Sequence, residues 1–400
     1  MIKLQDMERA RQTIQKTVYS TPLVTSDSIS AEVGRKVYLK LENLQKTGSF
    51  KLRGACYKIS KLASALGVKG IVAASAGNHA QGVALAASSR NIPVTIVMPH
   101  HAPLSKQLAT RGYGGKVVLR GESFEEAEAY ARDLEKEGLT MIHPFDDEDI
   151  ITGQGTIGLE VMEVLPDLDT IIVPIGGGGL ISGISMAVKE KKPDVQVIGV
   201  ESRAAASAFR SKREAKIVQV KPLPSIADGI AVKSVGQITY PIIQRYVDEV
   251  VVVEEDEIAA AILMLMERKR IVAEGAGAVT LAALLREEAK IKGSSCVLVI
   301  SGGNIDVNLI DRIIAQGLAK TGRIVRIAVN LRDVPGSLTN LSRIIAARGA
   351  NILHIHHDRI SQGIPIGASK VILELETAGV DHIGEILGKL REEDYTVELP

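Results

Sequence analysis

The feature that most constrains this chain is a repeated alternation of short apolar runs with helical patterns. Continuous apolar strands that alternate with helices form mainly parallel sheets covered on both faces. Ligands of such sheets bind beyond the carboxyl ends of the strands. The sequence therefore predicts an α/β fold with strands at 37–44, 70–74, 94–99, 116–119, 170–173, 195–200, 250–253 and 296–300.

The pattern changes near residue 322. From residue 323 the order is strand, helix, two strands, helix and strand, which is typical of the ferredoxin-like βαββαβ unit. The segment is long enough to form a small separate domain. We therefore expect one domain over 1–320, containing a small subdomain at roughly 47–150, and a second domain over 323–400.

Composition argues against two classes of partner. The formal net charge of +1 gives no electrostatic basis for binding nucleic acid or an anionic membrane. The stretch 170–188 is uncharged, but Pro174 and a run of glycines would break a membrane-spanning helix there. Cys56 and Cys296 are the only cysteines, which favours a reducing cytoplasm over a disulfide framework. The expected partners are small molecules and copies of the same chain.

Lys51 occupies an unusual place in the sequence. It follows the predicted strand at 37–44 and a turn, and Ser49 is the expected N-cap of a helix that carries Lys51 in its first turn. The positive end of the helix dipole disfavours an ammonium group there and lowers the pKa of Lys51. Schiff-base chemistry needs such a lysine, because only the neutral amine attacks an aldehyde. From this stretch alone, a solvated lysine is the alternative.

A tetraglycine loop lies between a predicted strand and a predicted helix. Its backbone N–H groups and the helix N-terminus favour a phosphate group as ligand, with a tight turn as the alternative. The G-x-G-x-x-G spacing of nicotinamide-binding folds is absent from 176–183, although Glu201 stands where such folds place a ribose-binding acid. The loop consists of Gly176, Gly177, Gly178 and Gly179, followed by Leu180.

Two further loops end predicted strands. The hydroxyl of Ser301 could face a ring nitrogen, and the adjacent glycines permit close approach, with a plain turn as the alternative. The other loop offers backbone amides at a helix start, which suit a carboxylate, and Asn78 could donate to a phenolic oxygen. This second loop consists of Ser75, Ala76, Gly77, Asn78 and His79.

The motifs around Lys51, Asn78, the tetraglycine loop and Ser301, in this order, resemble those of the threonine and serine dehydratase family of fold-type II pyridoxal-phosphate enzymes. The resemblance covers residues 1 to about 320. It implies two open, mainly parallel α/β subdomains and pyridoxal 5′-phosphate as the cofactor. It also implies that Lys51 holds the cofactor as a Schiff base, is displaced by L-threonine or L-serine, and then removes the Cα proton.

The same resemblance implies the other roles in the site. Phe50 would pack near the cofactor ring, Asn78 would meet the ring hydroxyl, and Ser301 would face the pyridine nitrogen. The tetraglycine loop with Leu180 would cradle the phosphate, and the loop from Ser75 to His79 would bind the substrate carboxylate. The expected products from threonine are 2-oxobutanoate and ammonia. A nicotinamide-dependent oxidoreductase and a non-catalytic amino-acid sensor are the alternatives to this lyase.

Two positions depart from the pattern of related proteins. Related serine racemases place a serine where this chain has Ala76, and alanine cannot carry a proton, so at most trace racemase activity is expected. The matching positions of the family's divalent-cation site are Glu201, Ala205 and Ser207, where a second carboxylate would be expected in the last place. A cation site is therefore only weakly indicated.

The tail resembles an ACT domain, a regulatory module that binds amino acids. The resemblance rests on the loop that contains Asp333, Pro335 and Gly336, which would bind an allosteric effector. A purely structural dimerisation role is the alternative, because fold does not fix function. His354 and His356 alternate along a predicted strand and are expected at a surface or an interface. We expect a homodimer or a homotetramer.

Overall fold

The computed structural model describes residues 2–64, 67–286, 290–361 and 363–399. The chain divides into two compact units, Met1–Ile305 and Asp306–Pro400. The second unit begins before the predicted boundary at 323, because helix α13 (Val307–Lys320) packs against the first strand of that unit. The outer ends of the two predicted domains, Met1 and Pro400, lie outside the described residues.

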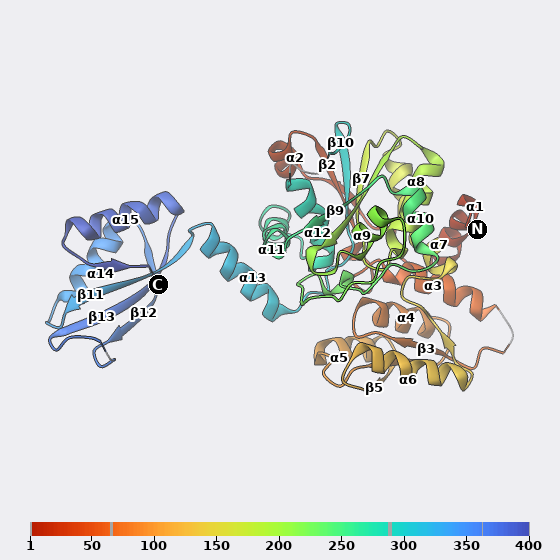
Figure 1. Ribbon diagram of the computed structural model, residues 1–400, viewed down its shortest axis with the longest axis horizontal. Helices are drawn as coiled ribbons and strands as arrows, with labels where there is room; N and C mark the ends of the chain where they lie inside the picture. The colour runs from red at the N-terminus through yellow and green to blue at the C-terminus, as the bar shows by residue number, and fades with distance from the viewer. Residues whose placement is uncertain (1, 65–66, 287–289, 362, 400) are drawn as a thin grey trace. The chain divides into compact units, whose positions relative to one another are not determined.

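The larger sheet of the first unit has six strands in the order β1-β2-β10-β7-β8-β9 (Figure 1). Strand β1 runs antiparallel to β2, and all the other neighbours pair in parallel. Strands β7 and β8 are buried along their whole length, as expected for a sheet with helices on both faces. The strands span Leu23–Thr25 (β1), Lys36–Leu41 (β2), Thr170–Pro174 (β7), Gln196–Ser202 (β8), Glu249–Val253 (β9) and Ser295–Ile300 (β10).

The smaller sheet has the order β5-β4-β3-β6, and all its pairs are parallel. Two open, mainly parallel sheets confirm the predicted fold class of the first unit. The sequence did not predict β6, which has only two residues. The strands span Ile71–Ala74 (β3), Val94–Met98 (β4), Lys116–Leu119 (β5) and Thr140–Met141 (β6), and the helices of this subdomain are α4 (Asn78–Ser88), α5 (Leu104–Gly112) and α6 (Phe124–Lys136).

Helix α3, which begins at Lys51, packs closely against α7. A Cβ added to Gly153 of α7 would lie 2.6 Å from the Cα of Gly54 in α3, so this approach requires glycine. These contacts fix the position of the helix that carries Lys51. The remaining helices of the unit, with α3, are α1 (Leu4–Ile14), α2 (Asp27–Val33), α3 (Lys51–Ala63), α7 (Glu148–Val164), α8 (Gly179–Lys191), α9 (Ser207–Glu214), α10 (Thr239–Tyr246), α11 (Glu255–Met264) and α12 (Gly275–Leu285).

Among the helices of the described ranges, none combines the length and the apolar character needed to cross a membrane. The uncharged stretch 170–188 folds as β7, the tetraglycine loop and part of α8, which confirms the predicted strand, loop and helix start.

The second unit contains the predicted order of strands and helices. Its four-stranded sheet has the order β12-β13-β11-β14 with antiparallel pairing throughout, which confirms the ferredoxin-like βαββαβ topology. The core includes Val329, Leu341, Leu373 and Leu390, all fully or almost fully buried. The elements span Ile324–Arg332 (β11), Ser337–Ala347 (α14), Asn351–Asp358 (β12), Ala368–Glu376 (β13), Val380–Glu392 (α15) and Val397–Glu398 (β14).

Candidate active site

The helix that carries Lys51 begins differently from the prediction. Phe50, not Ser49, is the N-cap residue, and its φ of −58° and ψ of −22° are already helical. The backbone of Ser49 instead forms an antiparallel bridge with Gly302. The expectation that Ser49 caps the helix is therefore wrong. Within the described part of the chain, the buried Ser49 hydroxyl has no hydrogen-bond partner.

The Lys51 amine has the predicted direction of pKa shift. Its Nζ donates to the Pro144 carbonyl oxygen at 2.9 Å and lies 5.2 Å from the centre of the Phe50 ring. Burial lowers the pKa of Lys51 to about 8, and the negative charge of Glu274 opposes this shift. The dominant cause is therefore burial and not the helix dipole that the sequence suggested. A neutral amine, which nucleophilic attack requires, is accessible near physiological pH.

The loop before α4 presents backbone amides and the Asn78 side chain. The backbone N–H of Gly77 donates to Ser75 Oγ at 3.2 Å, and Ala76 is partly buried against the core of the small subdomain. Asn78 Nδ2 donates to Glu274 Oε1 at 2.7 Å. His79 is buried, and burial lowers its pKa to about 3, so its ring is neutral and its Nε2 is held by a backbone carbonyl at 2.9 Å. The groups of this loop that the structure records in hydrogen bonds are therefore neutral, and each bonds to the protein itself.

The tetraglycine loop joins β7 to α8 as predicted. Gly178 is the N-cap of α8 with φ of +93°, a conformation that favours glycine. A Cβ added to Gly177 would lie 2.3 Å from the Phe145 ring. The Gly177 carbonyl oxygen accepts from Thr239 Oγ1 at 2.7 Å. The helix N-terminus and the close backbone approach give the loop the properties of a phosphate cradle, and Leu180, one residue into α8, is buried.

Backbone and side-chain contacts bring the four motifs together. The Phe50 N–H donates to the Ser301 carbonyl oxygen at 3.1 Å, which joins the Lys51 and Ser301 motifs. Pro144 accepts from Lys51, and the next residue, Phe145, lies against the tetraglycine loop. Asn304, three residues after Ser301, donates from its Nδ2 to Asn78 Oδ1 at 2.7 Å, which joins the Asn78 loop to the Ser301 motif. These contacts bring the predicted catalytic and cofactor-binding residues to one site in the first unit.

The chemistry of this site fits a ligand that carries both an aldehyde and a phosphate. Lys51 provides a partly buried amine, and Gly178 and its neighbours provide an anion cradle. The buried hydroxyl of Ser301 donates to the Ala276 carbonyl oxygen at 3.2 Å and retains lone pairs for a second contact. Ser49, two residues before Lys51, adds a buried hydroxyl that has no hydrogen-bond partner among the described residues. These properties match pyridoxal 5′-phosphate, whose aldehyde and phosphate would be bound by Lys51 and the tetraglycine loop.

Sequence reasoning missed Glu274. This residue is 5% exposed and precedes α12, whose eleven residues carry no charged side chain. A single acid at the start of an apolar Gly- and Ala-rich helix was the available signal, because such a carboxylate is buried with the helix. The segment around Pro144 and Phe145 was also missed, because the acidic run that follows it, Asp146 to Asp149, is typical of a helix start and does not point to a ligand.

The predicted cation-site residues lie at the end of β8 and the start of α9. Glu201 is buried, and its carboxylate accepts from the backbone N–H groups of Ala208 and Phe209 at 2.8 Å each. Ser207 Oγ lies 3.4 Å from Glu201 Oε1, and Ala205 contributes no oxygen-bearing side chain. Burial raises the pKa of Glu201 to about 7, and the hydrogen bonds to its carboxylate oppose this shift. In the described ranges, no group of three or more His, Cys, Asp or Glu residues has a metal-binding arrangement.

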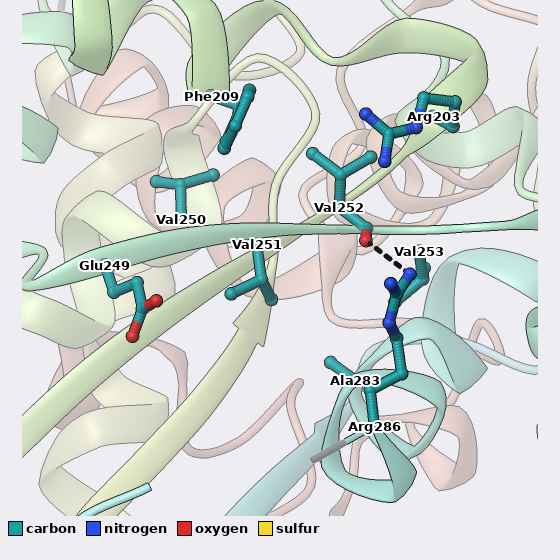
Figure 2. Close-up of a pocket in the computed structure, with 9 residues that line it drawn as sticks. All are labelled: Arg203, Phe209, Glu249, Val250, Val251, Val252, Val253, Ala283 and Arg286. Atoms are coloured by element: carbon teal, nitrogen blue, oxygen red, sulfur yellow. Dashed lines mark hydrogen bonds between the residues drawn. The ribbon is translucent and has the colours of Figure 1, made fainter. Parts of the chain in front are cut away.

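A cavity of about 210 Å³ lies elsewhere, against the edge strand β9 (Figure 2). Arg286 Nη1 donates to the Val252 carbonyl oxygen at 3.2 Å and pairs with Glu257 at 3.1 Å. Arg203 pairs with Glu254 at 3.0 Å. Both guanidinium groups are thus engaged by the protein, and none of the predicted site residues lines this cavity. It does not alter the assignment of the active site.

The second unit contains a cavity of about 420 Å³ around the loop predicted to bind an effector. Asp333, Pro335 and Gly336 line it, together with His357 and Arg359. Arg359 Nε donates to Asp333 Oδ1 at 2.8 Å. Within the described residues, the buried His357 Nε2 has no hydrogen-bond partner. The cavity therefore offers charged and polar groups to a small ligand.

Comparisons with known proteins agree with this geometry. Residues 14–302 match the family described as pyridoxal-phosphate dependent enzyme. An L-threonine ammonia-lyase of Thermotoga maritima is 51% identical over 400 residues, which is 100% of both chains. An L-threonine ammonia-lyase of Geobacter sulfurreducens is 48% identical over 395 residues, which is 98% of each chain.

Solved structures give the same result. Maize serine racemase matches with a TM-score of 0.75 at 38% identity, covering 80% of this chain and 98% of that chain. The threonine deaminase of T.th. matches with a TM-score of 0.72 at 41% identity, covering 76% of this chain and 99% of that chain. The family match and the nearly full-length relatives lead to one conclusion. The chain belongs to the family of pyridoxal-phosphate-dependent enzymes.

Proposed function

We propose that this enzyme converts L-threonine to 2-oxobutanoate and ammonia, and L-serine to pyruvate and ammonia. The observation that carries the proposal is the Lys51 amine, whose pKa is lowered to about 8 where the four motifs meet. The two L-threonine ammonia-lyases, at 51% and 48% identity over nearly the whole chain, support this choice of substrate. The enzyme is a lyase that depends on pyridoxal 5′-phosphate.

Each residue of the site has a proposed role toward the cofactor. Lys51 would hold it covalently, Phe50 would lie beside its ring, Asn78 would donate to its ring oxygen and Ser301 would face its ring nitrogen. Gly176, Gly177, Gly178, Gly179 and Leu180 hold its phosphate. When bound, the cofactor supplies an electron sink that acidifies the Cα proton of the substrate.

The chain's own groups then carry out the proton transfers. The amides of the loop from Ser75 to His79 bind the substrate carboxylate and orient the Cα–H bond. Lys51 Nζ would take the Cα proton. The β-hydroxyl would leave as water with the proton that Lys51 Nζ took from Cα, and hydrolysis of the dehydrated product would release ammonia and the keto acid. Ser301 would be a neutral partner that does not hold the ring nitrogen protonated, which would favour prompt elimination over transamination.

The absorbance spectrum of the purified protein tests this function. A yellow protein that loses its colour on borohydride reduction and forms 2-oxobutanoate from L-threonine would support it. Colour without keto acid would retain the cofactor but redirect the search to other β-substituted amino acids. A colourless protein would reopen the nicotinamide-dependent and sensor alternatives.

Maize serine racemase is among the similar structures, but we expect at most trace serine racemisation by this enzyme. Racemisation requires a second base that returns a proton to the opposite face of the substrate. At the position where related racemases place a serine, Ala76 offers no proton and packs partly buried against the core. We expect unreacted L-serine to remain L after many turnovers. Chiral chromatography checks this, and accumulation of D-serine in proportion to pyruvate would contradict it.

We also propose that the second unit is an ACT domain that binds an amino-acid effector. The cavity around Asp333, Pro335 and Gly336 supports this proposal, as does the His357 Nε2 in its lining, which has no hydrogen-bond partner among the described residues.

The exposed hydrophobic residues Leu353 and Ile355 on the sheet-edge strand β12 suggest that this unit also helps to form a homodimer or homotetramer. Two free, buried cysteines are compatible with a reducing cytoplasm.

Deleting residues 323–400 is expected to abolish the response to amino acids. The measurement is initial-rate 2-oxobutanoate formation with each standard L-amino acid added in turn, for the full chain and the truncated chain. In the full chain, Asp333→Ala is expected to weaken binding of the responding amino acid at least about tenfold, because a charged hydrogen-bonding group is lost from the cavity. An unchanged response in the truncated enzyme would contradict the regulatory role.

A further inference from the structure

Side-chain hydrogen bonds connect the Asn78 loop to two segments on the opposite side of the site. Asn304 Nδ2 donates to the Thr47 carbonyl oxygen and to Asn78 Oδ1, each at 2.7 Å. Asn78 Nδ2 in turn donates to Glu274 Oε1 at 2.7 Å. The amide of Asn78 is thus held at its oxygen by Asn304 and at its nitrogen by Glu274.

The groups at the two ends of this series of hydrogen bonds, the Thr47 carbonyl and the Glu274 carboxylate, determine the orientation of both side-chain amides. The Thr47 carbonyl oxygen only accepts, so Asn304 must turn its NH₂ group toward it. Both N–H bonds of Asn304 are then in use, and Asn78 must present its oxygen to Asn304. An ionised carboxylate at Glu274 also only accepts, which favours the same orientation of Asn78 from the other end. One N–H of Asn78 remains for a ligand.

We propose that Glu274 is a positioning residue that holds the Asn78 amide with its free N–H directed at the cofactor's ring oxygen. The proposal deepens the proposed function and rests on it, because the contact of Asn78 with the cofactor belongs to that function. In the proposed arrangement, Glu274 contacts neither substrate nor cofactor and acts through its hydrogen bond with Asn78.

The surroundings of Glu274 hold its carboxylate in place. Its backbone N–H donates to the Gly302 carbonyl oxygen at 3.0 Å, and it is the N-cap residue of α12. A Cβ added to Gly302 would lie 2.2 Å from Glu274 Oε1, so a side chain there would displace the carboxylate from its observed position. These contacts give Gly302 and Asn304 a role beside Glu274 and Asn78. The family resemblance did not assign a role to either residue.

Protonation of Glu274 would weaken its hold on the orientation of the Asn78 amide. Burial raises the pKa of Glu274 to about 7, and the charge on Asp228 also raises it. The hydrogen bond from Asn78 and the charges on Lys106 and Lys51 lower this pKa. Above this pH the carboxylate accepts only. Below it the carboxyl group can also donate, and the reversed Asn78 amide would then be tolerated at that end. The orientation of Asn78 is therefore less strictly fixed as the pH falls through about 7.

Glu274→Gln tests the proposal, because glutamine keeps the size of the side chain but can present either an acceptor or a donor. In the resting holoenzyme, we expect the wild-type cofactor absorbance to change between about pH 6 and pH 8, and this change to be absent from Glu274→Gln. At pH 8 the variant should lose about 10- to 100-fold in kcat, as when an orienting partner is removed, with KM for L-threonine changed less than about threefold. The acid limb of its kcat profile should also be lost.

Two further variants make the test specific. Glu255→Gln is the matched control, since Glu255 accepts from Ser202 Oγ, Ser225 Oγ and the Ile226 N–H and lies outside this chain of hydrogen bonds; it should keep the wild-type spectrum and profile. In an Asn78→Ala background, Glu274→Gln should add less than about a threefold loss, because a residue acting through Asn78 has no further effect without it.

The proposal is overturned if Glu274→Gln keeps the wild-type pH-dependent spectrum and kcat, or if the losses of Glu274→Gln and Asn78→Ala multiply. The unfolding midpoint of the cofactor-free variant, expected within a few degrees of wild type, checks that the fold is intact. If wild-type protein binds the cofactor but forms no keto acid, the proposed function fails, whereas the spectral titration of the resting protein still decides the role of Glu274.

Discussion

Lys51→Ala is expected to lower kcat for 2-oxobutanoate formation by about 10⁴-fold or more, because the variant loses both the covalent attachment of the cofactor and the group that moves the Cα proton. The rest of the site remains: the Asn78 amide, the glycine cradle and the Ser301 hydroxyl belong to other segments. The variant should therefore bind the cofactor reversibly, and borohydride should no longer fix the cofactor to the chain. Mass spectrometry after reduction and a coupled keto-acid assay measure these two results.

Lys61→Ala is the matched control for this variant. Lys61 lies on the same helix, α3, and pairs with Asp149 at 2.5 Å, but its side chain is 55% exposed. It should retain the wild-type rate and the reducible colour. Keto-acid formation by Lys51→Ala at more than about one hundredth of the wild-type rate would assign the proton transfer to another group.

The lowered pKa of Lys51 gives a second, independent measurement on the cofactor-free protein. The folded-state pKa is about 8 and the ordinary value is 10.5, so between these values the unfolded chain binds more protons than the folded one. The wild-type free energy of unfolding should therefore gain a contribution from Lys51 as the pH rises through this window, and lack it below pH 8. Lys51→Ala should lack this contribution, which urea unfolding at several pH values compares directly.

Much of the fold could be predicted from the sequence because burial on both sheet faces leaves a strong local signal. Strands such as β7 and β10 are mostly apolar runs, and the tail shows the βαββαβ order of strands and helices in its local patterns. Strand β6 could not be predicted in this way, because a pairing of two residues carries no periodicity. The division between the units also depends on tertiary packing, since α13 by itself is compatible with either unit.

Only part of the active site could be predicted from the sequence. Glycine runs and a lysine near a helix start have a chemical meaning that is readable locally, and the structure brings these motifs together. The start of α3 was mispredicted because a backbone bridge from Ser49 to Gly302, distant in sequence, replaces the local cap. The importance of Glu274 depends on burial and on a hydrogen bond to Asn78 across 196 positions, which no local pattern encodes.

A buried network of charges anchors the helix that carries Lys51. Arg53 is 1% exposed and donates to both oxygens of Glu42 at 2.8 Å each, and to Glu160 at 2.7 and 2.9 Å. Lys40 Nζ lies 2.5 Å from Glu160 Oε2, and its positive charge balances the charge of the second carboxylate, that of Glu160. The network joins α3 to β2 and α7 with two cationic and two anionic groups. Such a network is costly to break, because removing one partner leaves a buried charge uncompensated.

Arg53→Met is expected to destabilise the protein by about 3–5 kcal/mol at neutral pH, the range for a buried ion pair that loses one partner. Interaction with Arg53 and Lys40 overcomes the effect of burial and holds the pKa of Glu160 below its usual range. Without Arg53 that pKa should rise in the folded state, so folding of the variant would take up protons. The loss of stability relative to wild type should therefore be largest at neutral pH and shrink toward pH 5.

The double variant Arg53→Met/Glu42→Met separates charge from packing. It leaves Lys40 and Glu160 as a neutral pair at 2.5 Å, so it should recover part of the stability that Arg53→Met loses. Glu42 also accepts from Thr21 Oγ1, and the loss of that hydrogen bond limits the recovery. Urea unfolding of the cofactor-free proteins measures both variants at neutral pH and near pH 5. If the double variant were less stable than Arg53→Met by the full cost of a second truncation, packing and not unpaired charge would determine the stability of this helix.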